Sequence, residues 1–475
     1  MAPKARERYT AGMILLALVL AVPAAAAPAP RTFRVDYFHT GTAAAEQFSL
    51  DRLVLEPLPW PGNPAAPIDE TNSGKYLFEV RDRASNRLLY SRGFSSIYGE
   101  WETTPEAKEG ARTFSESFRF PAPAGPVQVR LQKRDARTNA FREVWSLLVD
   151  PKDMFVDDAA PPSAGALLAL QQKGPPAQKV DLLILGDGYT AAQRGKFERD
   201  ARRLVEILFA TSPFKERRDD FNVWGLCPPS AEAGISRPST GVHKRTPLGA
   251  TYDAFGSERY VLTFENRAFR EAASQAPYEL VEILVNGETY GGGGIFNLYS
   301  TVAADSLWAP YVFVHEFGHH IAGLADEYFT SDSAYESAAD RLEPWEPNVT
   351  ANPAHPKWSA LLSKDVPLPT PWDEQGFIDY EKGIQARRRK IRADRRPEAE
   401  MDALFNEEKA EDMKRLPAGK WGRSVGAFEG ANYEARGYYR AQTDCIMFSR
   451  DEVPFCAACR AALDRIIDLY APRAR

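Results

Sequence analysis

The sequence predicts a two-domain protein in which an N-terminal all-β sandwich precedes a larger α/β domain. Its 475 residues are enough for two or three domains. Between residues 30 and 155, short apolar–polar alternations are separated by turn residues, which is typical of strands. From residue 179 onward, apolar strands alternate with helical patterns, which indicates α/β layering. We therefore assign 30–155 to an accessory sandwich, 156–178 to a linker and 179–475 to the α/β domain.

Residues 1–26 have the pattern of a cleavable export signal. Three basic residues precede an apolar stretch at 11–22, and small residues follow it at 24–27. This stretch is shorter than the ~20 residues that a membrane-spanning helix needs, and no later apolar run in the sequence is long enough. We therefore expect a secreted or periplasmic protein without a membrane span, in a compartment where disulfides persist.

The strands of both domains are predicted from apolar segments that lie between turn residues. In the first domain they are 34–38, 75–80 and 127–131, with turns at 72–74 and 121–126. In the second domain they are 180–189, 221–226 and 260–264, while 279–285 fits either a strand or a helix end. Within the linker, residues 167–172 have a short helical pattern.

A helix is predicted from Ala191 to about Phe209, with Thr190 as its N-cap. The preceding turn, Gly186-x-Gly188, lacks the third glycine and the Lys-Ser/Thr pair of a phosphate loop, so we expect no nucleotide site. The glycine-rich segment 290–297 fits either the rim of a substrate cleft or a flexible loop.

The charge pattern argues against a nucleic-acid partner. The 59 Lys and Arg residues against 65 Asp and Glu residues give a formal net charge of -6. The basic run at 387–392 is interleaved with acidic residues at helical spacing between 372 and 413, which predicts a solvated helical pair. Oligomeric state does not follow from the composition.

The segment His315-Glu316-x-x-His319 follows an apolar run and predicts a metal site. On a helix, residues four apart share a face, so both imidazoles can bind one ion. Glu316 lies on the adjacent face, where it can take a proton from the attacking water without binding the metal. The chain has only 6 His, and three of them fall within six residues, which makes chance a poor explanation. The motif predicts one Zn²⁺ per chain.

A catalytic zinc site needs a third protein ligand and one open position. Gly323 permits a left-handed bend that ends the helix and turns the chain back toward the metal. The spacing from this glycine favours Asp326 as the third ligand, with Glu327 as the alternative. His320 points away from the other two histidines, and we expect it in a supporting or a solvent-facing position.

Metzincin peptidases combine the motif His-Glu-x-x-His-x-x-Gly-x-x-His with a methionine in a tight turn beneath the zinc. In this chain the glycine falls one position late, and Asp326 stands at the third site. Met447 is the candidate for the turn, and an ordinary core methionine is the alternative. Tyr438 or Tyr439, just before this turn, is a candidate oxyanion donor. We therefore expect an α/β domain of metzincin-like architecture.

Three of the four cysteines lie close together near the end of the chain, namely Cys445, Cys456 and Cys459, whereas Cys227 is distant. The Cys-x-x-Cys pair could be a redox motif or half of a zinc knuckle, but the sequence has no second such pair. We therefore predict one disulfide among the three, joining the Met447 turn to a terminal helix at 460–470.

These segments resemble peptidase family M64, which is named for bacterial immunoglobulin A peptidase. The resemblance includes the zinc motif from His315 to Tyr328 and the segments 183–189, 425–431 and 444–447. The segments 36–41 and 91–94 are similar to the N-terminal domain that precedes the peptidase in many members. The resemblance implies a secreted zinc endopeptidase with a protein or peptide substrate, and it leaves the particular substrate open.

Two other functions fit parts of this pattern. A zinc amidase acting on cell-wall peptides would use the same motif. A non-catalytic zinc-containing protein that binds through its sandwich is the other alternative, and an intact Glu316 argues against it, because a structural zinc site does not need a general base. We expect a zinc metalloendopeptidase in which Glu316 is the base.

Overall fold

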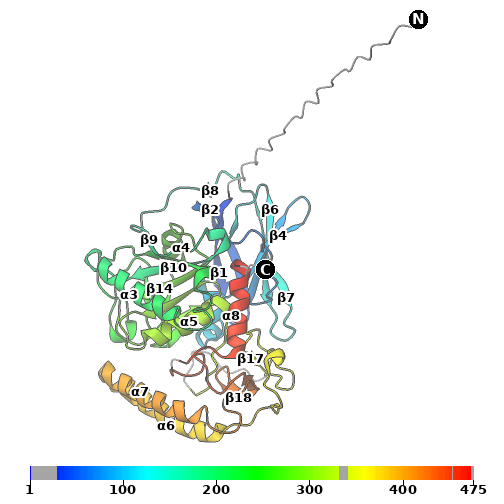
Figure 1. Ribbon diagram of the computed structural model, residues 1–475. Coiled ribbons are helices and arrows are strands. Elements are labelled where there is room, and N and C mark those ends of the chain that lie inside the picture. The colour runs from blue at the N-terminus through cyan, green and yellow to red at the C-terminus, as the bar shows by residue number, and fades with distance from the viewer. Residues whose placement is uncertain (2–28, 331–340, 452, 472–475) are drawn as a thin grey trace.

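The structure is a computed structural model that describes Met1 and residues 29–330, 341–451 and 453–471 (Figure 1). The export signal predicted for residues 1–26 lies outside this part of the chain, Met1 apart. In the described ranges, no helix combines the length and the apolar character that a bilayer span needs.

The N-terminal region consists of two four-stranded sheets, ordered β5-β1-β2-β8 and β4-β3-β6-β7. Their strands are β1 (Arg31–Gly41), β2 (Glu46–Pro59), β3 (Tyr76–Asp82), β4 (Leu88–Phe94), β5 (Arg112–Pro121), β6 (Val127–Arg134), β7 (Phe141–Val149) and β8 (Val156–Asp157). Alternate side chains of β6 are buried, as they are in strands whose one face covers a core. Phe78 and Phe118 stack in this core with ring centroids 4.8 Å apart. The predicted β-rich first domain is confirmed.

The second region is built on a six-stranded sheet ordered β15-β16-β14-β10-β11-β9. Its strands are β9 (Leu168–Gln171), β10 (Val180–Asp187), β11 (Phe221–Leu226), β14 (Leu280–Val285), β15 (Gly292–Ile295) and β16 (Tyr299–Ala303). The four inner strands run parallel, and the edge strands β9 and β15 run antiparallel to their neighbours. Every residue of β10, β11 and β14 is buried, which is typical of parallel strands that are covered on both faces.

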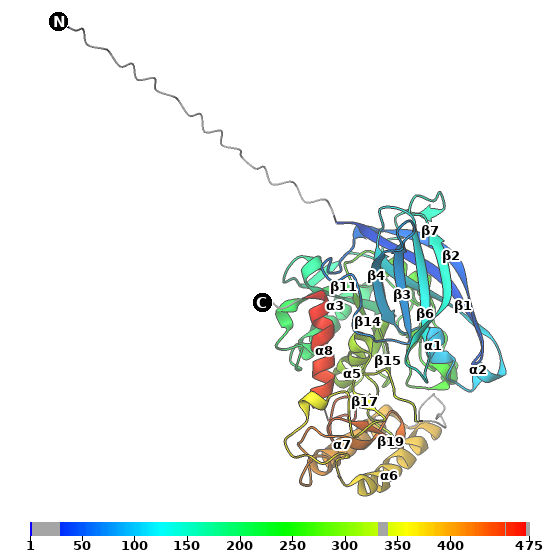
Figure 2. The ribbon, with the colours of Figure 1, turned by 90° about the vertical axis from the view of Figure 1, so that its right-hand side faces the viewer.

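Helices cover one face of this sheet, and the sandwich helps to cover the other. On the first face, Leu182 and Ile184 of β10 share a core with α3 (Arg194–Leu208), α5 (Ala309–Ala322) and α8 (Ala457–Tyr470). On the second face, Leu183 and Leu185 share a core with α4 (Asn266–Ala273) and with Trp101 of α1 (Ile97–Trp101), the helix that follows β4. A second short helix, α2 (Glu106–Glu109), precedes β5. Figure 2 shows the sandwich strands packed beside this sheet.

The predicted helix at 191–209 is present as a 3₁₀ turn (Ala191–Gln193) followed by α3, and Thr190 and Gln193 form a capping box before it. The helical pattern predicted at 167–172 is wrong. Residues 168–171 form β9, because they pair with β11 at the sheet edge, where the Gln171 side chain also donates to Phe221 O at 3.0 Å. The predicted linker thus supplies one strand to each region, since β8 pairs with β2.

Below the six-stranded sheet lie the helices α6 (Glu374–Ala393) and α7 (Glu398–Arg415) and the sheet β17-β19-β18, as Figure 1 shows. The short strands are β12 (Ala250–Thr251), β13 (Leu262–Thr263), β17 (Val349–Thr350), β18 (Phe428–Ala431) and β19 (Glu434–Arg440). Arg387 of α6 pairs with Glu407 of α7 through two bonds of 2.6 and 2.7 Å. The predicted helical pair is confirmed, although one of its faces is buried around Met401 and Phe405.

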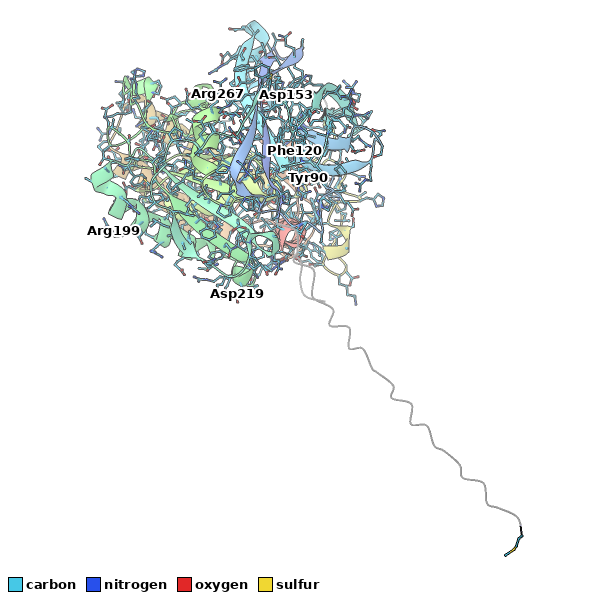
Figure 3. The ribbon with its side chains drawn as sticks, turned by 90° about the horizontal axis from the view of Figure 1, so that it is seen from above. Tyr90, Phe120, Asp153, Arg199, Asp219 and Arg267 are labelled. Atoms are coloured by element: carbon cyan, nitrogen blue, oxygen red, sulfur yellow. The ribbon has the colours of Figure 1, made fainter. Side chains whose placement is uncertain are left out.

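Hydrogen bonds join the sandwich to the α/β region. Ser95 N donates to Phe296 O at 2.9 Å, the Asn297 amide donates to Gly93 O at 3.0 Å, and Arg270 Nε donates to Ser117 Oγ at 2.8 Å. Seen from above in Figure 3, Tyr90 and Phe120 mark the sandwich side, and Arg199 marks the opposite side of the molecule. The sequence predicted an accessory role for the sandwich. In the structure it packs directly against the α/β region and is bonded to it.

Candidate active site

The helix α5 presents the histidine pair and ends where the sequence predicted. Gly323 adopts φ 58° and ψ 40°, a left-handed conformation that only glycine reaches without strain, and its N–H donates to His319 O at 3.0 Å. The chain reverses there, and Ala325 is fixed by a hydrogen bond of 2.8 Å from its N–H to Asn348 Oδ1. The residues after Gly323 therefore return along the helix.

The reversal brings two imidazole nitrogens and one carboxylate oxygen together. His315 Nε2 and His319 Nε2 are 3.1 Å apart, and Asp326 Oδ1 lies 3.0 Å from the first and 3.3 Å from the second. His315 Nδ1 lies 2.8 Å from Ile446 O, and His319 Nδ1 contacts Leu324 O in the same way. These backbone carbonyls can only accept, so each Nδ1 carries a proton and each Nε2 faces the shared point. Burial acts to lower the pKa of His319, but the Asp326 carboxylate outweighs it and raises that pKa to about 9, so a cation that binds here replaces a proton on Nε2.

Asp326 is buried and held as a carboxylate. Burial opposes its ionisation, but His319 and His315 outweigh burial and hold the pKa of Asp326 well below its ordinary range. Its Oδ2 accepts a hydrogen bond from the Tyr433 hydroxyl, while its Oδ1 faces the Nε2 atoms of the two histidines. Two imidazole nitrogens and a buried carboxylate oxygen that face one point are the ligand types of a zinc site.

Glu316 lies beside this triangle. One carboxylate oxygen of Glu316 and one ring nitrogen from each of His315 and His319 lie within 4.8 Å of one another. Burial raises the pKa of Glu316 above its ordinary value, although the two histidines act in the opposite direction. A raised pKa is what a general base needs in order to release its proton again near neutral pH.

The glycine-rich segment forms the edge strand β15 and lies directly against α5. A Cβ atom at Gly294 would come within 2.3 Å of Glu316 O, and one at Gly292 would come within 2.5 Å of Val312. Only glycine permits this approach, so these residues are required at the edge strand, and both line the cavity at the histidine pair. Of the two alternatives, the cleft rim agrees with this placement.

Met447 lies in a tight turn beneath α5. The turn is closed by a 2.8 Å hydrogen bond from Phe448 N to Cys445 O, and Met447 is fully buried with its sulfur against Gly318. Met447 O accepts from Glu327 N at 2.8 Å, so the turn also holds the segment that follows Gly323. The turn therefore contacts both the helix of the histidine pair and the segment that carries Asp326.

The hydroxyl groups of the two tyrosines predicted as oxyanion donors are bonded to other residues in the structure. The Tyr438 hydroxyl donates to Leu342 O at 3.0 Å on the cavity wall, and the Tyr439 hydroxyl donates to Glu429 at 3.3 Å. Tyr433 is the tyrosine that contacts Asp326. It occupies the two-residue turn between β18 and β19 at φ 63°, next to Asn432 at φ 53°, and two left-handed residues in succession are typical of a tight hairpin turn.

Sequence reasoning also missed Arg259 and Tyr311. Arg259 Nη2 donates to the Tyr328 hydroxyl at 3.1 Å, and Tyr311 Oη lies 3.1 Å from His315 Nδ1. Tyr311 is four residues before His315 on the same helix, so helical spacing could have found it. Arg259 precedes a short segment that runs beside β15, and no local signal marks it.

His320 does not face solvent, so that alternative is wrong. It is fully buried between α5 and the sheet, where its Nδ1 bonds to Ile295 O at 3.1 Å and its Nε2 accepts from Val281 N at 3.0 Å. Burial lowers the pKa of His320 to about 3, so the ring is neutral. The residue fastens the helix to β14 and β15.

The predicted disulfide is not present in the structure. All four cysteines are free thiols, and Cys445 Sγ and Cys459 Sγ are 3.9 Å apart, where a bond would need about 2.05 Å. Cys456 and Cys459 instead direct their sulfurs toward Glu327, at 3.6 and 3.3 Å from its Oε1. The side chains of these three cysteines thus converge on a carboxylate.

The site opens into a cavity of about 720 Å³ whose walls come from both regions of the protein. His315, Glu316, His319 and Asp326 line its floor. The sandwich contributes a wall that includes Lys75, Ser95, Glu100, Arg134 and Asn139. A cavity of this size with convergent ionisable groups at its floor is typical of an active site.

One end of the cavity is acidic. Glu381, Glu408 and Asp412 bring their carboxyl groups within 4.8 Å of one another, and all three are buried. Arg450 donates to Glu408 at 2.8 Å, and Thr330 donates to Glu381 at 3.0 Å. Burial and the like charges of its two neighbours raise the pKa of Asp412 to about 9.

Replacing Asp412 with Asn is expected to stabilise the protein in mildly alkaline solution. Asp412 titrates near ~3.9 in an unfolded chain, so between about pH 4 and 9 the folded state keeps a proton that the unfolded state releases. The contribution of Asp412 to the free energy of unfolding is therefore fully present below about pH 4 and is lost as the pH rises from about 4 to 9. Asp412→Asn should raise the free energy of unfolding by at least about 1 kcal/mol near pH 8, and by much less near pH 5.

Denaturant unfolding of both proteins across this pH range measures the effect. Asp379→Asn, at an exposed position of α6, is the matched control and should leave the pH dependence unchanged. A pH-independent difference for Asp412→Asn would contradict the assignment.

Two family models match the chain. Residues 168–467 match the model described as IgA Peptidase M64, and residues 26–146 match the model described as Peptidase M64 N-terminus. No curated protein sequence matches it. The first match begins at the first residue of β9 and includes the histidine pair, Asp326 and the Met447 turn. The resemblance found in the sequence is confirmed, and the chain belongs to peptidase family M64.

Proposed function

We propose that this M64 peptidase is a zinc-dependent endopeptidase of metzincin-like architecture that hydrolyses protein or peptide substrates. The observation that carries the proposal is the triangle of His315 Nε2, His319 Nε2 and Asp326 Oδ1, with sides of 3.0, 3.1 and 3.3 Å. Two nitrogen or oxygen ligands of a tetrahedral zinc lie about 3.3 Å apart, because Zn–N and Zn–O bonds are about 2.0–2.2 Å long. The donor set thus fits zinc, with Asp326 as the third ligand.

When bound there, zinc supplies Lewis-acid activation of the attacking water and of the scissile carbonyl. Glu316 takes the proton from that water and delivers it to the leaving amine, which its buried position and raised pKa favour. Ile446 O and Leu324 O hold the two imidazoles in the tautomer that leaves Nε2 unprotonated. Tyr433 holds Asp326 through Oδ2, so that Oδ1 stays directed at the histidines.

The edge strand β15 is the expected position of the substrate backbone. Gly292 and Gly294 line the cavity next to Glu316, so a peptide bound along β15 would lie beside the proposed general base. The left-handed Gly323 and the Met447 turn beneath α5 support the metzincin-like assignment. The pattern of residues 1–26 supports export to a secreted or periplasmic location.

Chelation tests the metal requirement. The mature protein should degrade denatured casein, 1,10-phenanthroline should abolish this activity, and added Zn²⁺ should restore it. The non-chelating isomer 1,7-phenanthroline is the matched control and should have no effect. Activity that survives metal removal, verified by elemental analysis, would overturn the proposal.

A second assay separates an endopeptidase from a cell-wall amidase. An endopeptidase should yield new internal cleavage sites in a protein digest and release nothing from purified cell-wall fragments. Release of peptides from cell-wall fragments without cleavage of casein would instead identify the protein as a cell-wall amidase.

A further inference from the structure

A second cluster of metal-type ligands lies behind the candidate active site. Glu327, Cys445, Cys456 and Cys459 are all buried, and their ligand atoms lie within 4.8 Å of one another. Glu327 comes from the segment after Gly323, Cys445 from the Met447 turn, and the last two cysteines from the start of α8. The residues come from three separate parts of the chain, and the function proposed above uses none of their side chains.

The spacing within the cluster is that of a tetrahedral metal site. Two sulfurs on one zinc lie about 3.8 Å apart and a sulfur and an oxygen about 3.6 Å, given bonds of about 2.3 Å to sulfur and 2.0–2.2 Å to oxygen. Cys445 Sγ and Cys459 Sγ are 3.9 Å apart, and Glu327 Oε1 lies 3.6 Å from Cys456 Sγ and 3.3 Å from Cys459 Sγ. The separation of Cys445 Sγ and Cys459 Sγ is too long for a disulfide.

The surroundings are suited to charged ligands. Cys445 Sγ faces the N–H groups of Cys456 and Met447 at 3.2 and 3.5 Å, and Cys456 is the N-cap of α8, where the N–H groups of the first turn favour negative charge. Asn348 donates to Glu327 Oε1 at 3.0 Å and orients the carboxylate. Glu327 Oε2 is buried without a hydrogen-bond partner in the protein. A buried carboxylate oxygen without a hydrogen-bond partner, next to three thiols, is suited to binding a cation.

We propose that Glu327, Cys445, Cys456 and Cys459 bind a second Zn²⁺, which is structural. Four protein ligands leave no open position, as in other structural zinc sites, and thiolates select zinc over magnesium or calcium. The charge of the buried Arg440 also acts on Glu327 and Cys445 and reduces the excess negative charge of the cluster.

This ion would fix the parts that shape the histidine site. Glu327 is adjacent to Asp326, and Cys445 is adjacent to Ile446, whose carbonyl orients His315. Joining both to the start of α8 would hold the chain reversal after Gly323 against the Met447 turn. The sequence disfavoured a zinc knuckle because a second Cys-x-x-Cys pair is absent. In the fold, Cys445 and Glu327 supply the two ligands that a second Cys-x-x-Cys pair would have supplied.

Metal counting on the mature protein tests the proposal. Elemental analysis and native mass spectrometry should find two zinc ions per chain, with a mass that shows four free thiols. The double variant His315→Ala/His319→Ala should keep one zinc, and Cys456→Ser/Cys459→Ser should lose the other. Cys227→Ser, at a half-buried cysteine outside the cluster, is the control and should keep both ions.

A second measurement covers the case in which the cysteine variant does not fold. In the His315→Ala/His319→Ala protein, Cys445, Cys456 and Cys459 should resist alkylation until a chelator removes the metal. Cobalt loaded into this variant should show thiolate-to-metal charge-transfer absorption. A His315→Ala/His319→Ala protein that holds no metal, or a native mass lighter by two hydrogens with a bridge between two of these cysteines, would overturn the site.

The outcomes separate this proposal from the proposed function. If the wild-type protein holds one zinc ion and the His315→Ala/His319→Ala protein also holds one, the cysteine site is supported and the histidine site is refuted. One zinc that disappears with the histidines would do the reverse.

Discussion

Glu316→Gln should lower peptidase turnover by at least about 100-fold while the zinc content stays unchanged. The substitution keeps the size and hydrogen-bonding shape of the side chain but removes its ability to accept a proton. Because Glu316 contributes no ligand atom to the triangle of His315, His319 and Asp326, the affinity for zinc should persist. Steady-state kinetics on a defined peptide, with elemental analysis of the same preparation, measure both quantities.

Glu343→Gln is the matched control, because Glu343 lines the same cavity but bonds to Thr350 and lies outside the cluster around the histidines. It should keep turnover near that of the unmodified protein. If Glu316→Gln retained most of the activity, the role of general base would have to pass to another residue.

Asp326→Ala should remove zinc from the histidine site and with it the peptidase activity. The substitution leaves two ligands instead of three and also removes the partner of Tyr433, so zinc affinity should fall by more than the ~10–100-fold typical of residues that only support a ligand. Titration of the metal-free protein with zinc, followed by the recovery of activity, measures the loss.

Glu327→Gln is the comparison, because Glu327 is the adjacent carboxyl group and the alternative third ligand. Its side chain faces Cys456 and Cys459, on the other side of the chain from the histidines. Glu327→Gln should therefore weaken metal binding at the cysteine cluster and leave zinc at His315 and His319. The opposite pattern, with Asp326→Ala retaining that zinc and Glu327→Gln losing it, would make Glu327 the third ligand.

Much of the site could be predicted because its core is local in sequence. The pair His315 and His319 and the position of Glu316 follow from helical periodicity. The reversal at Gly323 follows from the one residue type that adopts a left-handed conformation freely, and it places Asp326 by spacing alone. The β-rich first region and the helical pair α6 and α7 were likewise visible in local patterns of polarity and charge.

The errors arose where the outcome depends on distant contacts. The helical pattern at 167–172 became strand β9 because an open sheet edge was available beside β11. The predicted disulfide rested on closeness in sequence, whereas the three cysteines converge on Glu327, which lies 129 residues before Cys456. Tyr438 and Tyr439 were chosen for their place before Met447, but the β18–β19 turn brings Tyr433 to Asp326 instead.

The sequence by itself determined which residues could act on a metal, because the ligand types and their helical spacing are encoded within a dozen residues. Only the tertiary structure decided what surrounds them. The sandwich wall of the cavity, the tyrosine that holds Asp326 and the cluster of Glu327 with three cysteines all join segments that are remote along the chain. Such contacts form only when the packing of the sheet and helices overcomes the entropy of closing long loops, and no local pattern records that outcome.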